Sequence, residues 1–211
     1  MSNKIIIEGG SGEIVEKKSR FIATVKAVET EEEAIAFINE MKKKYWDARH
    51  NCMAYIVNDI KRFSDDGEPQ GTAGKPILDV LEGKNISNGV IVVTRYFGGI
   101  LLGTGGLVRA YQKSAIEGLE NSVIAEKCNG YISVILTDYN GLGKIQYIAS
   151  NEGINLIDIM YTDNVTIKFV SLKDEYNSFV NKVIEATAGK AQISDRNEID
   201  FYKTENGIHI I

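Results

Sequence analysis

The sequence has few residues of the kinds that cross-link, ligate or interrupt a chain. Among its 211 residues are two cysteines, Cys52 and Cys128, whereas a secreted disulfide scaffold carries more. We therefore expect reduced thiols and a cytoplasmic location. Two histidines, His50 and His209, leave little material for a zinc site, so no metal ligand is assigned. Only two prolines occur, and no polar low-complexity tract, which argues against long disordered segments.

Long apolar runs are also missing. The longest, such as Val90–Val93, fall far short of the roughly 20 residues that span a bilayer. The first residues lack the apolar core and small-residue cleavage site of a signal peptide, so we expect no membrane partner. The formal net charge of −5 excludes a surface that binds nucleic acid all over, but leaves a local basic patch open.

The N-terminal part alternates strand and helix patterns. Thr30 is followed three residues on by Glu33, the spacing of a capping box, and a helix with an apolar face follows. The run Gly89–Thr94 is rich in β-branched residues and predicts a central strand. The other elements expected here are a hairpin of Lys4–Glu8 with Glu13–Lys18, strands Arg20–Val28 and Asn51–Val57, a loop Asn58–Gly74, a short helix around Ile77–Glu82, and a helix Leu107–Asn121.

The pattern changes near Lys127–Gly130. From there the order is strand, helix, strand, strand, helix, strand, which is typical of a ferredoxin-like split βαβ domain. Residues 202–211, with a turn at Asn206-Gly207, are expected to add a strand. We therefore predict an α+β protein with an N-terminal domain at 1–127 and a C-terminal domain at 128–211.

A glycine-rich segment, Tyr96–Leu107, joins the central strand to the following helix. Glycine at this density exposes backbone N–H groups, which with the positive end of a helix can hold a phosphate or carboxylate. The alternative is that the glycines allow tight packing around Phe97 and Leu101. The spacing matches neither a P-loop nor a dinucleotide fingerprint. The candidate anion or nucleic-acid ligands are Arg95, Gly98, Gly99, Gly103, Gly105, Gly106, Arg109 and Lys75.

A second loop carries three carboxylates, Asp65, Asp66 and Glu68. Such a cluster can bind magnesium or supply a general base. The competing interpretation, which we favour, is an Asp-Asp-Gly turn whose side chains cap nearby backbone N–H groups, because no complete set of metal ligands is spaced here.

His50 and Cys52 lie two residues apart at the start of a strand and so share a face. They would suit a thiol nucleophile and its base, but nothing in the sequence indicates a lowered thiol pKa. We expect a structural histidine and a buried cysteine instead.

Four sequence motifs are long enough to compare with known families: SRFI at 19–22, RHNCMAY at 49–55, SDDGEPQGTAGKPIL at 64–78 and TRYFGGILLGTGGLVRAY at 94–111. With them the sequence resembles the YigZ/IMPACT family. The resemblance implies an N-terminal βαβ domain like the second domain of a small-subunit ribosomal protein, with a left-handed arrangement. It also implies a C-terminal ferredoxin-like domain similar to one near the end of elongation factor G.

The resemblance also bears on function. Eukaryotic members regulate translation by restraining activation of a kinase that acts on an initiation factor. They carry a further domain whose partner binding is not transferred to this sequence, and the bacterial branch has no settled activity. Likeness of fold to translation factors does not by itself establish function.

Three hypotheses remain at this stage. The leading one is a non-enzymatic, translation-associated binding protein that contacts RNA phosphate or a ribosomal or other protein partner through the glycine-rich loops. The second is an enzyme acting on a phosphorylated or carboxylated small molecule, with metal assistance from the acidic loop. The third is an interaction protein whose loops only shape a docking surface. The sequence does not identify a cofactor.

Overall fold

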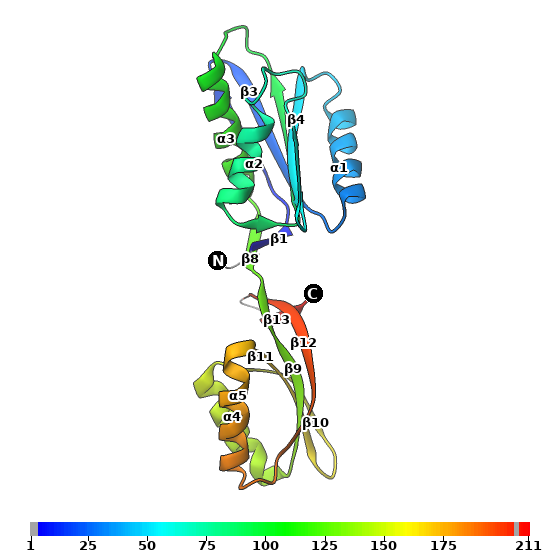
Figure 1. The fold of residues 1–211 in the computed structure, drawn as a ribbon, viewed down its shortest axis with the longest axis vertical. Coiled ribbons are helices and arrows are strands. Elements are labelled where there is room, and N and C mark those ends of the chain that lie inside the picture. Colours follow the sequence, from blue (N-terminus) through cyan, green and yellow to red (C-terminus); the bar gives the residue numbers. More distant parts are fainter. Residues whose placement is uncertain (1–3, 205–206) are drawn as a thin grey trace. The chain divides into compact units, whose positions relative to one another are not determined.

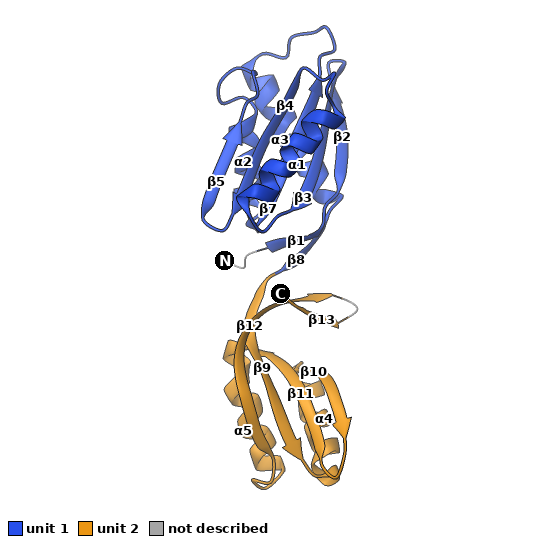
Figure 2. Cartoon of the chain, turned by 90° about the vertical axis from the view of Figure 1, so that its right-hand side faces the viewer, with its two compact units in different colours: residues 1–126 blue, residues 127–211 orange. Residues whose placement is uncertain are grey.

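The computed structural model describes residues 4–204 and 207–211 and divides into two compact units, one ending at Glu126 and the other beginning at Lys127 (Figure 2). Each unit combines helices with a mostly antiparallel sheet, so the α+β class is confirmed. Among the described residues, no helix is both long and apolar enough to cross a membrane.

The first unit is built on a five-stranded antiparallel sheet. Its strands, in spatial order, are β2 (Ser11–Glu16), β3 (Ser19–Ala27), β7 (Gly89–Tyr96), β4 (His50–Val57) and β5 (Ile60–Ser64). β7 is buried from Gly89 to Arg95, which confirms it as the central strand. β-branched residues suit this position because both faces of the sheet are covered by helices.

Helices lie on both faces of this sheet (Figure 1). α1 (Glu31–Lys44) covers one face, and α2 (Gly74–Gly83) and α3 (Thr104–Glu120) cover the other. Thr30 caps α1 as its spacing from Glu33 predicted, since the Glu33 N–H donates to Thr30 Oγ1 at 3.2 Å. The Glu33 carboxylate accepts from the N–H of Glu29, one residue before the N-cap, at 2.8 Å rather than from that of Thr30.

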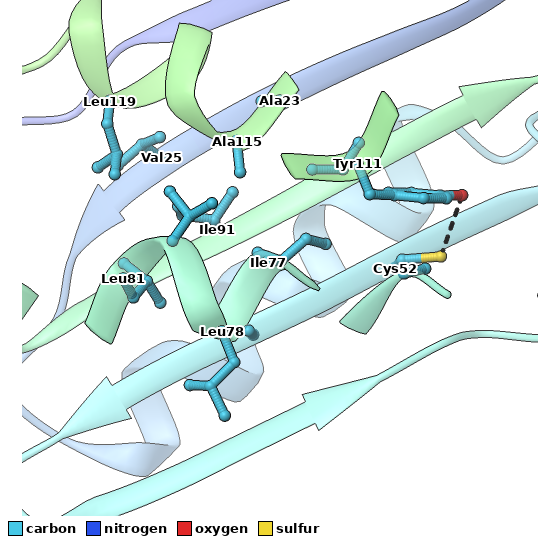
Figure 3. Packing of buried hydrophobic residues seen from close by; sticks show 14 of the residues in the cluster. Ala23, Val25, Cys52, Ile77, Leu78, Leu81, Ile91, Tyr111, Ala115 and Leu119 are labelled. Carbon is cyan, nitrogen blue, oxygen red and sulfur yellow. Dashed lines mark hydrogen bonds between the residues drawn. The ribbon is translucent and has the colours of Figure 1, made fainter. Parts of the chain in front are cut away.

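The main core of the first unit lies between the sheet and α2 with α3. Ile77 and Leu81 of α2, Ile91 of β7 and Tyr111 of α3 are fully buried there (Figure 3). Gly118 brings α3 close to the sheet, because a Cβ at this position would lie 2.9 Å from the Ala23 Cβ. Packing of this kind holds α3 against the sheet.

The predicted hairpin between residues 4–8 and 13–18 is wrong. β1 (Lys4–Glu8) instead joins β6 (Ile86–Ser87) and β8 (Val123–Glu126) in a separate three-stranded sheet. β2 pairs with β3 through a tight turn in which Lys17 and Lys18 have φ of 46° and 68°. Two successive left-handed residues make the turn that suits a twisted hairpin, but lysine gives no sequence indication of it.

Three further boundaries differ from the prediction. The expected loop 58–74 contains β5, because β4 continues into a hairpin in which Val57 pairs with Ile60. α2 begins at Gly74, two residues before Pro76, and α3 begins at Thr104, three residues before Leu107. Glycine lies in the first turn of both helices, at Gly74 in α2 and at Gly105 and Gly106 in α3, so propensity alone places their starts too late.

The second unit has the predicted strand and helix order. Its elements are β9 (Cys128–Thr137), α4 (Tyr139–Glu152), β10 (Asn155–Tyr161), β11 (Val165–Leu172), α5 (Lys173–Ala186), β12 (Gln192–Thr204) and β13 (Gly207–Ile210). The sheet order β10-β11-β9-β12-β13 inserts β11 between β9 and β10, which is the split βαβ arrangement. The added final strand is present as β13, while Asn206 of the predicted turn lies outside the described residues.

Candidate functional site

Three of the four sequence motifs contribute residues to one pocket of about 350 Å³, called the loop pocket below. Its lining comes from the start of β4, the acidic loop, the end of β7 and the glycine-rich loop, through residues that include His50, Glu68, Arg95, Phe97 and Thr104. Strand register explains the meeting of two of these segments. His50 of β4 pairs with Arg95 of β7, so their side chains lie next to each other on one face of the sheet.

A buried ion pair forms the floor of the loop pocket. Arg95 Nη1 donates to Glu68 Oε1 at 2.6 Å, and the two side chains are only 6% and 4% exposed. The Tyr111 hydroxyl donates to the same oxygen at 2.8 Å. Arg95 was expected to flank a bound anion, but its charge is directed at Glu68.

Aromatic rings enclose the Arg95 guanidinium. Its central carbon lies 5.3 Å from the Phe21 ring centroid and 5.6 Å from that of Phe97. Rings at this distance attract a cation through their negative faces. Arg95 Nε is buried, and no hydrogen-bond partner for it lies in the described part of the chain.

His50 is held in one orientation. Its Nδ1 lies 2.8 Å from the Asp66 carbonyl oxygen. A carbonyl only accepts hydrogen bonds, so Nδ1 carries the proton and donates it. Its Nε2 lies 3.9 Å from Glu68 Oε1, which is beyond hydrogen-bond distance but within ion-pair distance when the ring is protonated.

Cys52 follows His50 by two residues on β4, and its side chain is fully buried. Its sulfur is 3.0 Å from the Asp65 carbonyl oxygen and 3.3 Å from the Tyr111 hydroxyl (Figure 3). Burial, more than any other cause, raises the pKa of the Cys52 thiol well above its ordinary value, and the nearby Glu68 carboxylate adds to this. A protonated thiol is a poor nucleophile, so the structural interpretation of Cys52 is the better supported.

Asp65 organises the turn that precedes α2. Its Oδ1 accepts from the N–H groups of Ala73 and Gly74 at 3.0 and 2.8 Å, and its Oδ2 accepts from the Gly71 N–H at 2.8 Å. α2 has no side-chain cap from its own N-cap residue. A carboxylate from earlier in the chain therefore satisfies the first N–H groups of this helix.

Asp66 has a similar structural role. Its Oδ2 accepts from the Asn51 N–H at 2.7 Å, and its Oδ1 lies 2.9 Å from Lys42 Nζ. Both aspartates therefore fit the interpretation of a capped turn better than that of a metal site. Within residues 4–204 and 207–211, no group of three His, Cys, Asp or Glu side chains is arranged to hold a metal ion.

The glycine-rich loop divides into two parts with different roles. Gly98 packs against the β2–β3 turn, since a Cβ there would lie 2.0 Å from the Lys18 carbonyl carbon, and its N–H donates to Ser19 Oγ at 3.1 Å. Gly99 (φ 84°) and Gly103 (φ 73°) adopt left-handed backbone with open space around them. Gly98 therefore serves packing against the β2–β3 turn, whereas Phe97 and Leu101, around which tight packing was the alternative expectation, are 40% and 82% exposed.

The second part of the loop forms the start of α3. Gly103 is the N-cap residue, no side chain caps the helix, and its first turn holds no acidic residue. The first N–H to bond within the helix is that of Leu107, which donates to the Gly103 carbonyl at 2.9 Å. Thr104 is the first helical residue. No carboxylate of the first turn therefore offsets the positive end of the α3 helix dipole.

A second depression borders the same turn of α3 and has a volume of about 250 Å³. It is called the basic hollow because three exposed cationic residues, Lys17, Arg109 and Lys113, line it together with Glu16 and Gly106. Lys17 and Lys113 were not among the predicted ligands. The spacing of Arg109 and Lys113, four residues apart on one helix, was a sequence indication of a shared face.

Lys75 lies elsewhere. It forms ion pairs on α2 with Asp79 and, at 3.7 Å, with Glu82. It lines neither the loop pocket nor the basic hollow. We therefore remove it from the group of candidate anion ligands.

Comparison with known proteins places the chain in a family. Residues 17–119 match the Impact N-terminal domain, and residues 135–190 match a domain of unknown function, DUF1949. The IMPACT family member YvyE of Bacillus subtilis is 44% identical over 89% of this chain and 88% of its own length. The chain belongs to the IMPACT family.

Two further relatives agree with this assignment. The IMPACT family member YigZ of Escherichia coli is 34% identical over 84% of this chain and 89% of its own length. A solved structure described as that of a hypothetical protein is 32% identical, covers 92% of this chain and 97% of its own, and has a TM-score of 0.58. The resemblance drawn from the motifs is thereby confirmed, and all four motifs lie within or overlap the first unit.

Proposed function

We propose that this protein is a non-enzymatic, translation-associated binding protein that contacts RNA phosphate at the first turn of α3. The observation that carries the proposal is the basic hollow, in which Lys17, Arg109 and Lys113 lie beside Gly106 of the uncapped first turn of α3, with one carboxylate, Glu16, on the same lining. Among the described residues, none of these three side chains has an ion-pair or hydrogen-bond partner, so their charges are available to a ligand.

Phosphate suits this arrangement for two physical reasons. The first N–H groups of a helix point at an incoming anion, and the helix dipole favours negative charge there. Three cations nearby add an attraction that decreases with salt. Because the whole chain carries a net charge of −5, binding would be confined to this local patch.

Association with translation is supported by membership of the IMPACT family, because the family resemblance implies that eukaryotic members regulate translation. RNA is then the phosphate-bearing partner most abundant in that setting, and a ribosomal or other protein partner is the alternative. The enzymatic hypothesis is weakened by the site itself. Asp65 and Asp66 bind backbone N–H groups, Glu68 is paired with Arg95, and the Cys52 thiol stays protonated.

The test is fluorescence anisotropy with a labelled single-stranded RNA and the whole chain. The double variant Arg109→Ala, Lys113→Ala removes two charges from the basic hollow and is expected to weaken binding at least tenfold at low salt. Lys43→Ala, Lys44→Ala is the matched control, because it removes two exposed charges from α1. Equal affinities for the two double variants would contradict the proposal.

A further inference from the structure

The loop pocket contains a buried hydrogen-bond donor that phosphate binding in the basic hollow leaves unused. Arg95 lines the pocket with a side chain only 6% exposed, and its Nε is buried without a hydrogen-bond partner in the part of the chain that the structure describes. The other two nitrogens are engaged, since Nη1 donates to Glu68 at 2.6 Å and Nη2 donates to Ser19 Oγ at 3.4 Å. A buried donor without an acceptor is costly, which indicates that a ligand supplies one.

The start of α3 brings further donors to the same pocket. Gly103, the N-cap residue, and Thr104, the first helical residue, both line it. The N–H groups ahead of Leu107 have no acceptor within the helix, and neither a side-chain cap nor an acidic residue of the first turn offsets the helix dipole. A negatively charged acceptor suits both this helix start and Arg95.

The charges of the loop pocket favour a ligand with one negative charge. Its lining holds two cations, Arg49 and Arg95, and one carboxylate, Glu68. Arg95 and Glu68 offset each other as an ion pair, so with a neutral His50 the exposed Arg49 leaves one positive charge in balance. A carboxylate neutralises that charge, whereas a phosphate monoester carries about 1.5–2 negative charges at neutral pH.

The walls of the loop pocket are mostly apolar. Phe97 and Leu101 line it and are 40% and 82% exposed, and Pro69, Leu102 and Leu107 belong to the same lining. Apolar walls around a few polar groups are typical of small-molecule sites, and the volume of about 350 Å³ lies within their range. An apolar group attached to the anion covers these side chains, whereas the ribose units that flank an RNA phosphate are polar.

We propose that the loop pocket binds a carboxylate that carries a short aliphatic or aromatic group. One carboxylate oxygen accepts from Arg95 Nε, and the other faces Arg49 and the first N–H groups of α3. The Phe97 ring centroid lies 5.6 Å from the central carbon of the Arg95 guanidinium. Because this ring is partly exposed and Nε is covered, the ring turns aside to admit the oxygen. The apolar group of the ligand then lies against Phe97 and Leu101.

Two sources supply this chemistry: a free carboxylic acid, and the C-terminal carboxylate of a peptide that ends in an apolar residue. A chain end differs from a free acid by the amide group next to it, so small probes distinguish the two. The site is separate from the one assigned to RNA phosphate, because the loop pocket and the basic hollow have no charged residue in common among their described lining residues.

The experiment records NMR spectra of the whole chain during titration with 4-methylpentanoate, a free acid, and N-acetylleucine, which represents a chain end. Both are expected to give saturable shifts of the Arg95 Nε–H signal and of the Thr104 amide signal. Their neutral amides, 4-methylpentanamide and N-acetylleucinamide, should bind at least about tenfold more weakly, because they lack the charge that the arginines attract. Tighter binding of N-acetylleucine than of 4-methylpentanoate assigns the site to a chain end, and equal or weaker binding assigns it to a free acid.

Arg49 carries the mutational test, since substitution of Arg95 would break the buried ion pair and risk unfolding. Arg49→Gln removes an exposed charge from the pocket and should weaken binding of both acids about tenfold. Arg62→Gln is the matched control, because Arg62 is an exposed arginine outside the pocket lining. Equal effects of the two variants, absence of a saturable shift of the Arg95 Nε–H signal, or equal binding of acids and amides would each overturn the proposal.

Inorganic phosphate and the double variant of the basic hollow separate the carboxylate site from the proposed function. Displacement of both acids by an equal concentration of phosphate would overturn the assignment of a carboxylate. Acid binding should be unchanged in Arg109→Ala, Lys113→Ala, and its loss there would overturn the loop pocket as the site. Acid binding by a parent protein that binds no RNA would retain the carboxylate site and remove the proposed function.

Discussion

The Arg95 guanidinium donates to the Glu68 carboxylate at 2.6 Å in a setting where both side chains are almost fully buried. This pair joins the end of β7 to the acidic loop and so fixes the floor of the loop pocket. Removal of one partner leaves a buried charge without its counterion, which typically costs about 3–5 kcal/mol.

We therefore expect Arg95→Met to lower the free energy of unfolding by about 3–5 kcal/mol in urea titration. Adding Glu68→Gln should recover part of the loss, because the remaining amide is neutral and still accepts from Tyr111. Arg20→Met is the matched control: Arg20 pairs with Glu13 at the surface and should cost at most about 1 kcal/mol. A loss no greater than the control's would show that the buried pair is not a stabilising contact.

Asp65 offers a second test of the site's architecture. Asp65→Ala removes the acceptor of three backbone N–H groups before α2, and hydrogen bonds to a charged group are worth about 1.5–3 kcal/mol. We expect thermal or urea unfolding to report a loss of that size. Asp59→Ala, an exposed aspartate in the β4–β5 turn, should change stability by less than about 0.5 kcal/mol. Equal losses of stability in the two variants would contradict the capping role of Asp65.

Alkaline pH should destabilise the protein through Cys52. Its folded pKa is raised by burial, whereas the unfolded thiol titrates near 8.5. Above about pH 8.5 the unfolded state loses this proton and the folded state keeps it, so stability falls as pH rises, by up to about 1.4 kcal/mol per pH unit. Below that pH the thiol is protonated in both states and contributes no slope.

The measurement is the free energy of unfolding between pH 8 and 10 for the parent and for Cys52→Ala. Because the variant lacks this titrating proton, its free energy of unfolding is expected to fall less steeply with pH than that of the parent. Tyr111, whose pKa is also raised by burial, contributes a later decline to both proteins. Parallel curves for the two proteins would mean that Cys52 ionises as readily in the folded state as in the unfolded chain.

The division of the chain can be tested with fragments. We expect 1–126 and 127–211 each to unfold cooperatively, because each holds a hydrophobic core of its own. A fragment that starts at residue 131 should be less stable, since it lacks Cys128–Gly130, which pair with Ile199–Phe201 in β12. An NMR spectrum of 127–211 with the narrow shift range of an unfolded chain would contradict independent folding.

Local patterns predicted a good part of the fold. The cap of Thr30 and Glu33 and the buried strand Gly89–Thr94 both depend on neighbours in the sequence, and both are present. The turn at Lys17-Lys18 was missed because its left-handed backbone is imposed by the pairing of β2 with β3 rather than by the residue type.

The site was predicted less completely. The sequence identified Arg95, Glu68 and Arg109 as candidates, but which cation pairs with Glu68 depends on the register of β7 with β4. Lys17 and Lys113 both line the basic hollow although they lie 96 residues apart in the sequence. No local sequence pattern predicts that residues so far apart meet.

Salt dependence of RNA affinity tests the central claim most directly. If the basic hollow holds RNA phosphate, a plot of log affinity against log salt concentration should be shallower for Arg109→Ala, Lys113→Ala than for the parent. Loss of two phosphate contacts to a single strand changes that slope by about 1.4. Lys43→Ala, Lys44→Ala should keep the parent's slope. Equal slopes for the parent and the Arg109→Ala, Lys113→Ala variant would contradict phosphate binding at the first turn of α3.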